Sequence, residues 1–188
     1  MSKRRSQEQF FQELTQLLIT EGISGLTIAE MAARLKCSRR RLYEIAASKE
    51  EIFTKVCEQV LNNHLQKSLL AAHKESKADA AISIYLRSAL NTSGLAKAAL
   101  IDLDSLEEGR AVFDAYQTAR IRGLQEMMVR GMEEGVLAPH HPRAISEALI
   151  GAAFRLRDQN FLEEEGLSIG DAFNEFYNVI LHGLLKRA

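Results

Sequence analysis

The sequence contains only two prolines, Pro139 and Pro142, and they lie close together. Because proline breaks the interior of an α-helix, the long stretches on either side can form uninterrupted helices. Ala, Leu, Glu, Arg and Lys dominate these stretches, and alternating β-branched runs are nearly absent. This composition is typical of helical proteins. The 188 residues suffice for one compact domain or two small ones that share a helix, and we predict an all-α fold.

The sequence lacks the signals of a membrane or secreted protein. No apolar run approaches the roughly 18 residues that a membrane span needs. The opening "MSKRRSQEQF" is basic, but no apolar segment follows it, as a secretory signal would require. The two cysteines, Cys37 and Cys57, have no partners at the spacing of a metal site. We therefore expect a reduced, cytoplasmic protein with no membrane partner, no metal and no other cofactor.

Charge is distributed unevenly along the chain. Residues 1–55 carry ten Lys and Arg against seven Glu, a balance of +3, so the net charge of −1 leaves −4 for the remainder. A basic N-terminal segment on an acidic body is typical of a protein that holds a polyanion at one end.

Capping-box spacing, in which Ser or Thr precedes Gln or Glu by three residues, marks helix starts in the first third of the chain. Apolar residues at helical spacing then indicate two short helices separated by a tight turn, with one helix before them and a long helix after them. This is the helix-turn-helix arrangement. The expected helices span about residues 6–22, 27–35, 38–45 and 48–73, with capping boxes at Ser6–Gln9, Thr27–Glu30 and Ser48–Glu51.

Three consecutive arginines, Arg39 to Arg41, open the third of these helices. Positive charge at a helix start opposes the helix dipole, so the cluster needs another reason. With Leu42 taken as the inward direction, Arg40 points about 160° away from the core, and Arg41 and Tyr43 lie on opposite flanks. Arg39 falls closer to the core side. We expect Arg40 to reach base edges in a DNA groove, while Arg39, Arg41 and Tyr43 hold the phosphate backbone. The alternative is a solvated helix start without a partner.

The segment "GLTIAEMAARLKCSRRRLYEIAASKEEIF" (25–53) resembles the DNA-binding module of the TetR family of transcriptional regulators. The resemblance covers about residues 8–53. It implies a three-helix DNA-binding domain over residues 1–47 and a helical effector-binding and dimerisation domain over residues 48–188. The residues that it assigns to DNA contact are Thr27, Ser38, Arg39, Arg40, Arg41, Tyr43 and Lys49. Lys49 also fits physically, because it follows a helix cap at Ser48 whose N-terminus would face a phosphate.

Three departures from the family pattern stand in this segment. Ile45 and Ala46 replace the usual His-Phe pair, which removes a phosphate contact and fills less of the core. Lys36 occupies a turn position that is usually glycine, so it must take a left-handed or otherwise strained conformation. Arg40 stands where glycine is common, so operator rules from other members do not transfer.

The rest of the sequence predicts a helical body. Helices are expected at about 76–91, 106–134, 142–164 and 168–187, with a short segment at 94–103 and the main loop at 135–142. The last two helices carry the small residues Gly151 to Ala153 and an apolar stripe from Phe173 to Leu184. In the family this pair forms the dimer interface. The alternative is that both stripes pack on their own chain.

The resemblance also implies a small-molecule effector held inside the body, whose identity the sequence does not give. Core packing is the competing interpretation for each candidate contact. Gln117 and Arg120 are the most informative, because polar groups on an apolar face need partners if they are buried. The candidate contacts are His64, Tyr85, Phe113, Tyr116, Gln117, Arg120, Met127 and Phe154.

We therefore predict a ligand-responsive regulator that binds a palindromic double-stranded DNA operator as a homodimer, and acts as a repressor released by a small molecule. Activation in place of repression stays open. The competing hypothesis is a helical small-molecule-binding or protein-interaction module that no longer reads DNA. An enzyme is the third option, but the sequence has no Gly-rich phosphate loop and no arguable Ser-His-Asp or Cys-His set, so we expect no catalysis.

Overall fold

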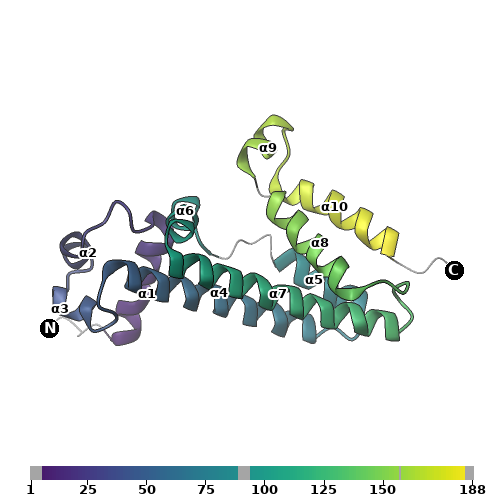
Figure 1. Cartoon of the computed structure of the whole chain (residues 1–188), viewed down its shortest axis with the longest axis horizontal. Helices are drawn as coiled ribbons and strands as arrows, with labels where there is room; N and C mark the ends of the chain where they lie inside the picture. Colours follow the sequence, from purple (N-terminus) through teal and green to yellow (C-terminus); the bar gives the residue numbers. More distant parts are fainter. Residues whose placement is uncertain (1–5, 89–93, 157, 185–188) are drawn as a thin grey trace. The chain divides into compact units, whose positions relative to one another are not determined.

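The computed structural model describes residues 6–88, 94–156 and 158–184, and its regular elements are α-helices (Figure 1). This confirms the predicted all-α class. None of the helices in these ranges combines the length and apolar character needed to cross a bilayer. The helices are α1 (Gln7–Glu21), α2 (Ile28–Arg34), α3 (Arg39–Tyr43), α4 (Lys49–His73), α5 (Ala78–Ser88), α6 (Lys97–Ser105), α7 (Glu107–Glu133), α8 (Pro142–Arg155), α9 (Gln159–Glu164) and α10 (Ile169–Leu184).

The chain divides into two compact units. Unit 1 comprises Met1–His64 and Ser93–Ala115, and unit 2 comprises Leu65–Thr92 and Tyr116–Ala188. The division falls inside α4 and inside α7, so each of these long helices belongs partly to both units. The boundary predicted at residue 47 lies before this division, and a DNA-binding domain confined to residues 1–47 stays a prediction.

Helix α1 in unit 1 begins where its capping box predicts. The Ser6 hydroxyl accepts a hydrogen bond from the Gln9 N–H at 3.0 Å, and the Gln9 side chain accepts one from the Ser6 N–H at 3.1 Å. Thr27 and Glu30 form the same reciprocal pair at the start of α2. Phe10, Leu14 and Leu18 form the buried face of α1, and α1 packs against α6.

The turn between α2 and α3 adopts the conformation expected from Lys36. The φ angle of Lys36 is 48°, in the left-handed region. Its neighbour Cys37 donates its N–H to the Ala32 carbonyl at 2.9 Å, which closes the end of α2. Ser38 then caps α3, with its hydroxyl 3.3 Å from the N–H of Arg41. The predicted helix-turn-helix is therefore present, although α3 ends at Tyr43.

Helix α4 starts at the third predicted capping box, but only one of the two hydrogen bonds of that box forms. The Ser48 hydroxyl accepts from the Glu51 N–H at 3.0 Å. The Glu51 carboxylate, however, accepts from the N–H of Ala47 at 3.1 Å, one residue before the position that a capping box would use. Ile52 and Phe53 follow and are fully buried in the core of unit 1.

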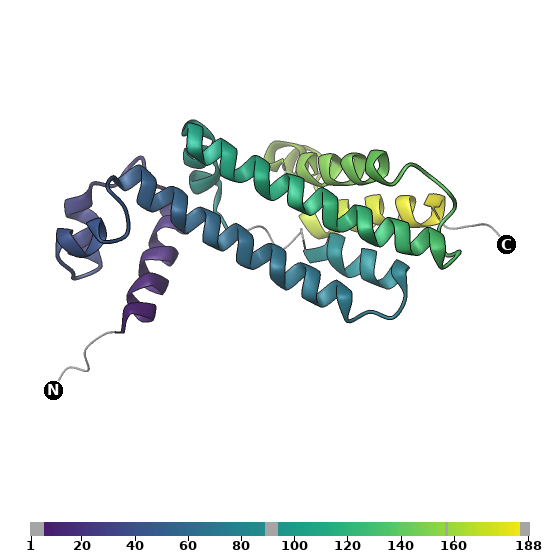
Figure 2. The same ribbon diagram turned by 60° about the horizontal axis from the view of Figure 1, so that its bottom comes forward.

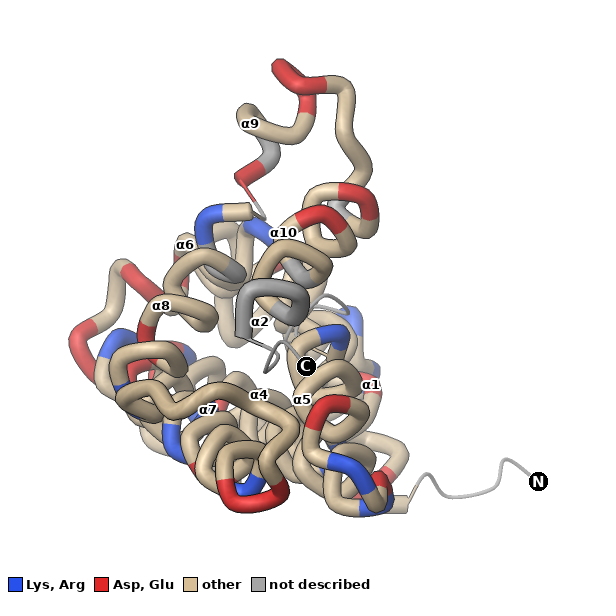
Figure 3. Tube along the Cα trace, turned by 90° about the vertical axis from the view of Figure 1, so that its right-hand side faces the viewer, with Lys and Arg blue, Asp and Glu red and all other residues tan. Residues whose placement is uncertain are grey.

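In unit 2, α8 and α10 run side by side in opposite directions, with α9 at the turn between them (Figures 1 and 2). Helix α10 also packs against α5. The predicted single helix over 142–164 is wrong, because α8 ends at Arg155. The Asp158 carboxylate accepts the N–H groups of Asn160 and Phe161 at 3.0 and 3.1 Å, so this side chain starts a new helix where the old one would have continued. Acidic residues cluster at the end of α9 (Figure 3).

Candidate nucleic-acid interface

Arg40 points outward from α3, as the sequence predicted. Its side chain is 89% exposed, and its Nε lies 3.4 Å from the Glu44 carboxylate one turn later. Tyr43 is 51% exposed, which is unusual for so large an aromatic side chain. Leu42 on the same helix is fully buried and fixes the rotation of the short helix. Arg40 and Tyr43 therefore stand on the solvent side of the second helix of the helix-turn-helix.

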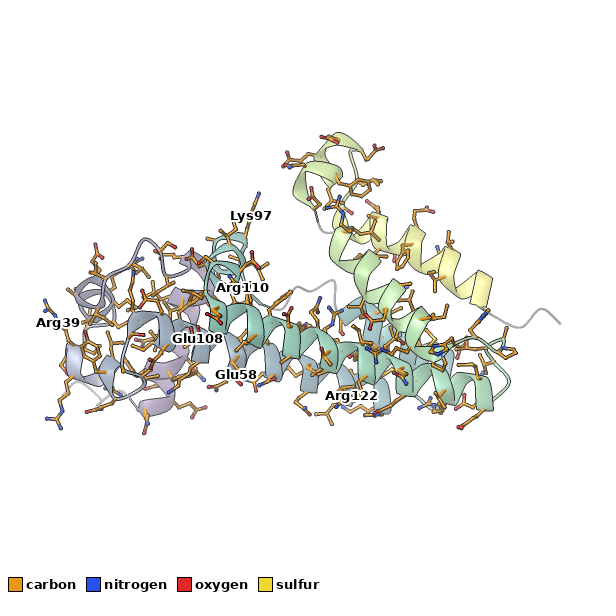
Figure 4. The ribbon with its side chains drawn as sticks, viewed as in Figure 1. Arg39, Glu58, Lys97, Glu108, Arg110 and Arg122 are labelled. Carbon is orange, nitrogen blue, oxygen red and sulfur yellow. The ribbon has the colours of Figure 1, made fainter. Side chains whose placement is uncertain are left out.

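The predicted orientation of Arg39 is wrong, whereas Arg41 lies on a flank of α3 as expected. Arg39 was expected closer to the core, but it is exposed and extends away from α3 (Figure 4). Arg41 is half-buried instead, because its guanidinium stacks 4.2 Å from the centroid of the Phe10 ring on α1. The ring covers one face of that guanidinium and leaves its N–H edges open to a second partner. Arg41 thus joins α3 to α1.

The Thr27 and Ser38 side chains lie at helix starts and are exposed. The Thr27 hydroxyl is 2.7 Å from the Glu30 carboxylate. The Ser38 hydroxyl accepts the N–H of Arg41, and its own hydrogen remains available as a donor. Both residues therefore shape the helix starts, whatever else they bind.

Lys49 has a structural role that sequence reasoning missed. Its ammonium group donates to the backbone carbonyls of Leu26 at 2.9 Å and Ile23 at 3.3 Å. The nearest carboxylate oxygen, on Glu50, lies 3.9 Å away, and the Lys49 side chain is only 29% exposed. The charge predicted to meet a phosphate therefore already holds the loop before α2. Direct contact of Lys49 with DNA stays a prediction.

Asp102 on α6 holds the same loop from its N–H side. Its carboxylate accepts the N–H of Ile23 at 2.5 Å and the N–H of Ser24 at 2.9 Å, and it also accepts the Ser24 hydroxyl. Burial alone would raise the pKa of Asp102, but the three hydrogen bonds and the charge of Lys49 outweigh it and hold the pKa below its usual value. We call Asp102, Lys49 and loop residues 22–26 the loop clamp. Its only sequence signal was an aspartate within the apolar segment "AALIDL".

Gly22 makes the close approach of Asp102 possible. Its φ of 76° lies in the left-handed region, and a Cβ placed there would collide with the Asp102 carboxylate. A bidentate ion pair next to the loop, between Arg34 on α2 and Glu21 on α1, joins the two helices at 2.5 and 2.6 Å. The hydrogen bonds from Arg34 hold the pKa of Glu21 below its usual value. The loop and its neighbours are therefore fixed by charge as well as by packing.

The candidate effector contacts are divided between the two units. His64 and Phe113 belong to unit 1, and the others belong to unit 2. Met127 is buried farther along α7, and the Phe154 side chain lies outside those that the structure describes. The residues that the fold brings together are Tyr85, Tyr116, Gln117 and Arg120.

Arg120 is the centre of this group and is only 7% exposed. Its Nη1 donates to the Gln117 side-chain oxygen at 3.0 Å, and its guanidinium lies 5.6 Å from the centroid of the Tyr116 ring. The Tyr85 hydroxyl donates to the backbone carbonyl of Arg120 at 3.0 Å. Within the described part of the chain, the buried Nη2 of Arg120 has no hydrogen-bond partner. Among the same residues, no group of three or more His, Cys, Asp or Glu side chains could hold a metal ion.

Solved structures with the same arrangement of helices are transcriptional regulators. A putative regulator from Saccharomonospora viridis in complex with choline aligns with a TM-score of 0.81 at 14% identity, over 95% of this chain and 96% of its own. A TetR transcription regulator from Haloarcula marismortui aligns with a TM-score of 0.78 at 15% identity, over 95% and 100%. The chain has the TetR fold. This confirms the architecture that the resemblance of residues 25–53 implied.

Other solved structures agree with this assignment of the fold. Reduced NemR from E. coli aligns with a TM-score of 0.78 at 17% identity, over 96% of this chain and 98% of its own. No protein-family model matches the sequence, and no curated protein matches it. The likeness therefore lies in the TetR fold itself, with little sequence shared.

Proposed function

We propose that this protein is a DNA-binding transcriptional regulator that reads its operator with α3. The observation that carries the proposal is the exposure of Arg39, Arg40 and Tyr43 on the second helix of the helix-turn-helix. A helix of this motif lies in the major groove, where arginine recognises guanine and backbone-facing cations meet phosphates. A helix that binds no polyanion has little physical reason to place consecutive arginines at its positive end.

The three arginines have different proposed roles. Arg40, which points straight out, reaches base edges, and Glu44 orients its guanidinium from one turn away. Arg39 and the open edges of Arg41 meet phosphates, together with the Tyr43 hydroxyl and the exposed hydroxyls of Thr27 and Ser38. Lys49 acts through the loop clamp, which sets the start of α2.

We also propose that the protein acts as a homodimer through α8 and α10, because a palindromic operator requires two copies of α3 related by a two-fold axis. Gly151 on α8 supports this, since it is exposed and a Cβ added there meets nothing within 4 Å. Val179 on α10 is 67% exposed and gives the second helix an apolar surface residue. We further propose that the dimer represses transcription while it is bound to the operator and that a small molecule releases it from the DNA.

The effector of this chain is proposed to differ from the choline bound to the Saccharomonospora viridis regulator. Choline is a cation, and the buried guanidinium of Arg120 would repel it. The body of this chain is therefore suited to a different class of small molecule.

The test starts by selecting bound fragments from a random duplex DNA pool, followed by titrations on the selected operator at several salt concentrations. Arg40→Ala should lose about 1–3 kcal/mol of binding free energy for the selected operator and relax the sequence preference at one base pair. Arg39→Ala should weaken binding to all DNA sequences alike. It should also lower the slope of log K against log salt concentration, the salt slope, by about one unit. The matched control is Arg122→Ala, an exposed arginine on α7 (Figure 4), which should change neither quantity.

Two outcomes separate the alternatives. If the pool yields no enriched sequence, the fold serves as a binding module that does not read DNA. If Lys49→Ala lowers the salt slope by about one unit, Lys49 contacts a phosphate directly, as the sequence predicted. An unchanged slope with weaker binding indicates action through the loop clamp.

A further inference from the structure

Arg120 carries a buried positive charge for which the described residues provide no counterion within ion-pair distance. Two arginines on α7 make the contrast clear. Arg130 has a counterion, because its Nε lies 2.9 Å from the Glu134 carboxylate, although without hydrogen-bond geometry, and its Nη2 donates to the Glu75 carbonyl at 3.2 Å. Arg120 is more deeply buried, yet its one hydrogen-bond acceptor is the neutral amide of Gln117, and its Nη2 has none among the described residues. A buried cation in this state is strongly disfavoured unless an anion joins it.

The aromatic neighbours do not supply that anion. The Tyr85 hydroxyl already donates to the Arg120 carbonyl. Burial raises the pKa of Tyr85 far above its ordinary value, with smaller contributions from Tyr116 and Glu126, although the charge of Arg120 opposes this shift. Tyr85 therefore stays protonated and neutral at physiological pH. The Tyr116 ring lies 5.6 Å from the guanidinium, measured to its centroid, and its neutral aromatic face is not a counterion.

Apolar side chains flank the charge along the same helix. Leu124 and Met127 follow Arg120 at one and two turns on α7, and both are buried. A ligand that reaches the guanidinium therefore meets one cationic group next to apolar and aromatic surface. An amphiphilic anion satisfies both parts, because a carboxylate accepts two parallel N–H bonds from arginine and an apolar body replaces water on the adjoining side chains.

We propose that Arg120 is the anchor for the carboxylate of a small amphiphilic effector. This inference rests on the proposed function, which requires an effector, and it adds the chemical class. The bound carboxylate would neutralise the charge that the described residues leave unpaired at Arg120. A carboxylate that binds only the folded state raises the melting temperature in a saturable way.

The experiment uses the full chain and a series of straight-chain monocarboxylates from acetate to dodecanoate, each compared with its neutral primary amide at the same ionic strength. At least one carboxylate should raise the melting temperature saturably, and its amide should not. Arg120→Met should melt at or above the parent temperature without ligand, because an unpaired buried charge has been removed. It should also bind the active carboxylate about tenfold more weakly, or worse.

Arg122→Met is the matched control, because Arg122 is exposed on the same helix and should leave the response unchanged (Figure 4). The proposal is overturned if no carboxylate of the series stabilises the parent, if acid and amide act alike, or if Arg120→Met responds like the parent. Operator binding is measured on the same samples. A parent that binds DNA but ignores every carboxylate refutes the anchor alone, whereas a carboxylate response without DNA binding refutes the regulator alone.

Discussion

Replacing Asp102 by Asn keeps the shape of the side chain and removes its charge, which tests the loop clamp directly. The carboxylate accepts from the N–H groups of Ile23 and Ser24 and from the Ser24 hydroxyl. An Asn can direct its oxygen to the two N–H groups and its amide to the hydroxyl, so every bond can be replaced by a neutral one. Hydrogen bonds to charged groups contribute about 1.5–3 kcal/mol against about 0.5–1.5 for neutral ones. The difference is about 1–1.5 kcal/mol per bond, so over three bonds the loss of stability is about 3–4.5 kcal/mol.

In a chain of this size such a loss lowers the melting temperature by roughly 6–18 °C. Asp104→Asn is the control, because Asp104 is exposed on the same helix, and it should change the stability by less than about 0.5 kcal/mol. Urea and thermal unfolding followed by circular dichroism measure both variants. The interpretation of the clamp fails if Asp102→Asn and Asp104→Asn are equally stable at neutral pH.

The pH dependence gives this prediction a second readout. The folded-state pKa of Asp102 is lowered, so its stabilisation is present above the unfolded-state value of about 3.9 and is lost as the pH falls through the folded value. The stability gap between parent and Asp102→Asn should therefore be constant from about pH 5 to pH 8 and close in stronger acid. A gap that widens towards low pH would contradict this assignment of the charge.

Three further predictions follow from single positions. Lys36→Gly should raise the stability by about 0.5–1 kcal/mol in urea unfolding, because φ is 48° and glycine adopts that region without strain; a destabilised variant would show that the Lys36 side chain matters more. Gly151→Arg should leave the fold intact, since a Cβ there meets nothing within 4 Å, and should convert the proposed dimer to monomers in sedimentation velocity; an unaltered dimer would move the interface elsewhere. Burial, and secondly the charge of Asp102, raises the pKa of Cys57 to about 12, so its thiol should resist iodoacetamide at about pH 9 in the folded protein and react in urea, as peptide mass spectrometry would detect.

Features of the fold that depend on neighbours in sequence were predictable. The capping pairs at Ser6 and Thr27 depend on residues three apart. The left-handed turn at Lys36 was implied by the resemblance, because the matching family position is usually glycine. The break between α8 and α9 was missed although its cause is also local. The Asp158 side chain caps a new helix and so prevents the previous one from continuing. The spacing of apolar residues, on which the prediction relied, carries no information about such capping.

The missed features of the site depend on residues far apart in sequence. The helical wheel treated α3 alone, whereas the ring of Phe10 decides that Arg41, and not Arg39, is the half-buried arginine. Asp102 meets the loop across 79 residues of sequence. No spacing rule connects such positions, so the contact became visible only with the packing of α6 against α1.

The two charges of the loop clamp are not interchangeable, because the peptide groups between them have a direction. Asp102 faces the N–H ends at Ile23 and Ser24, and Lys49 faces the carbonyl ends at Ile23 and Leu26. An ordinary ion pair survives the exchange of its partners, since each charge sees only the other. Here an exchange would place a cation against N–H groups and an anion against carbonyl oxygens, and both contacts would become repulsive. The loop segment is a dipole whose N–H end faces Asp102 and whose carbonyl end faces Lys49. We therefore expect neutral substitutions at Asp102 and Lys49 to be tolerated better than substitutions that reverse the charge.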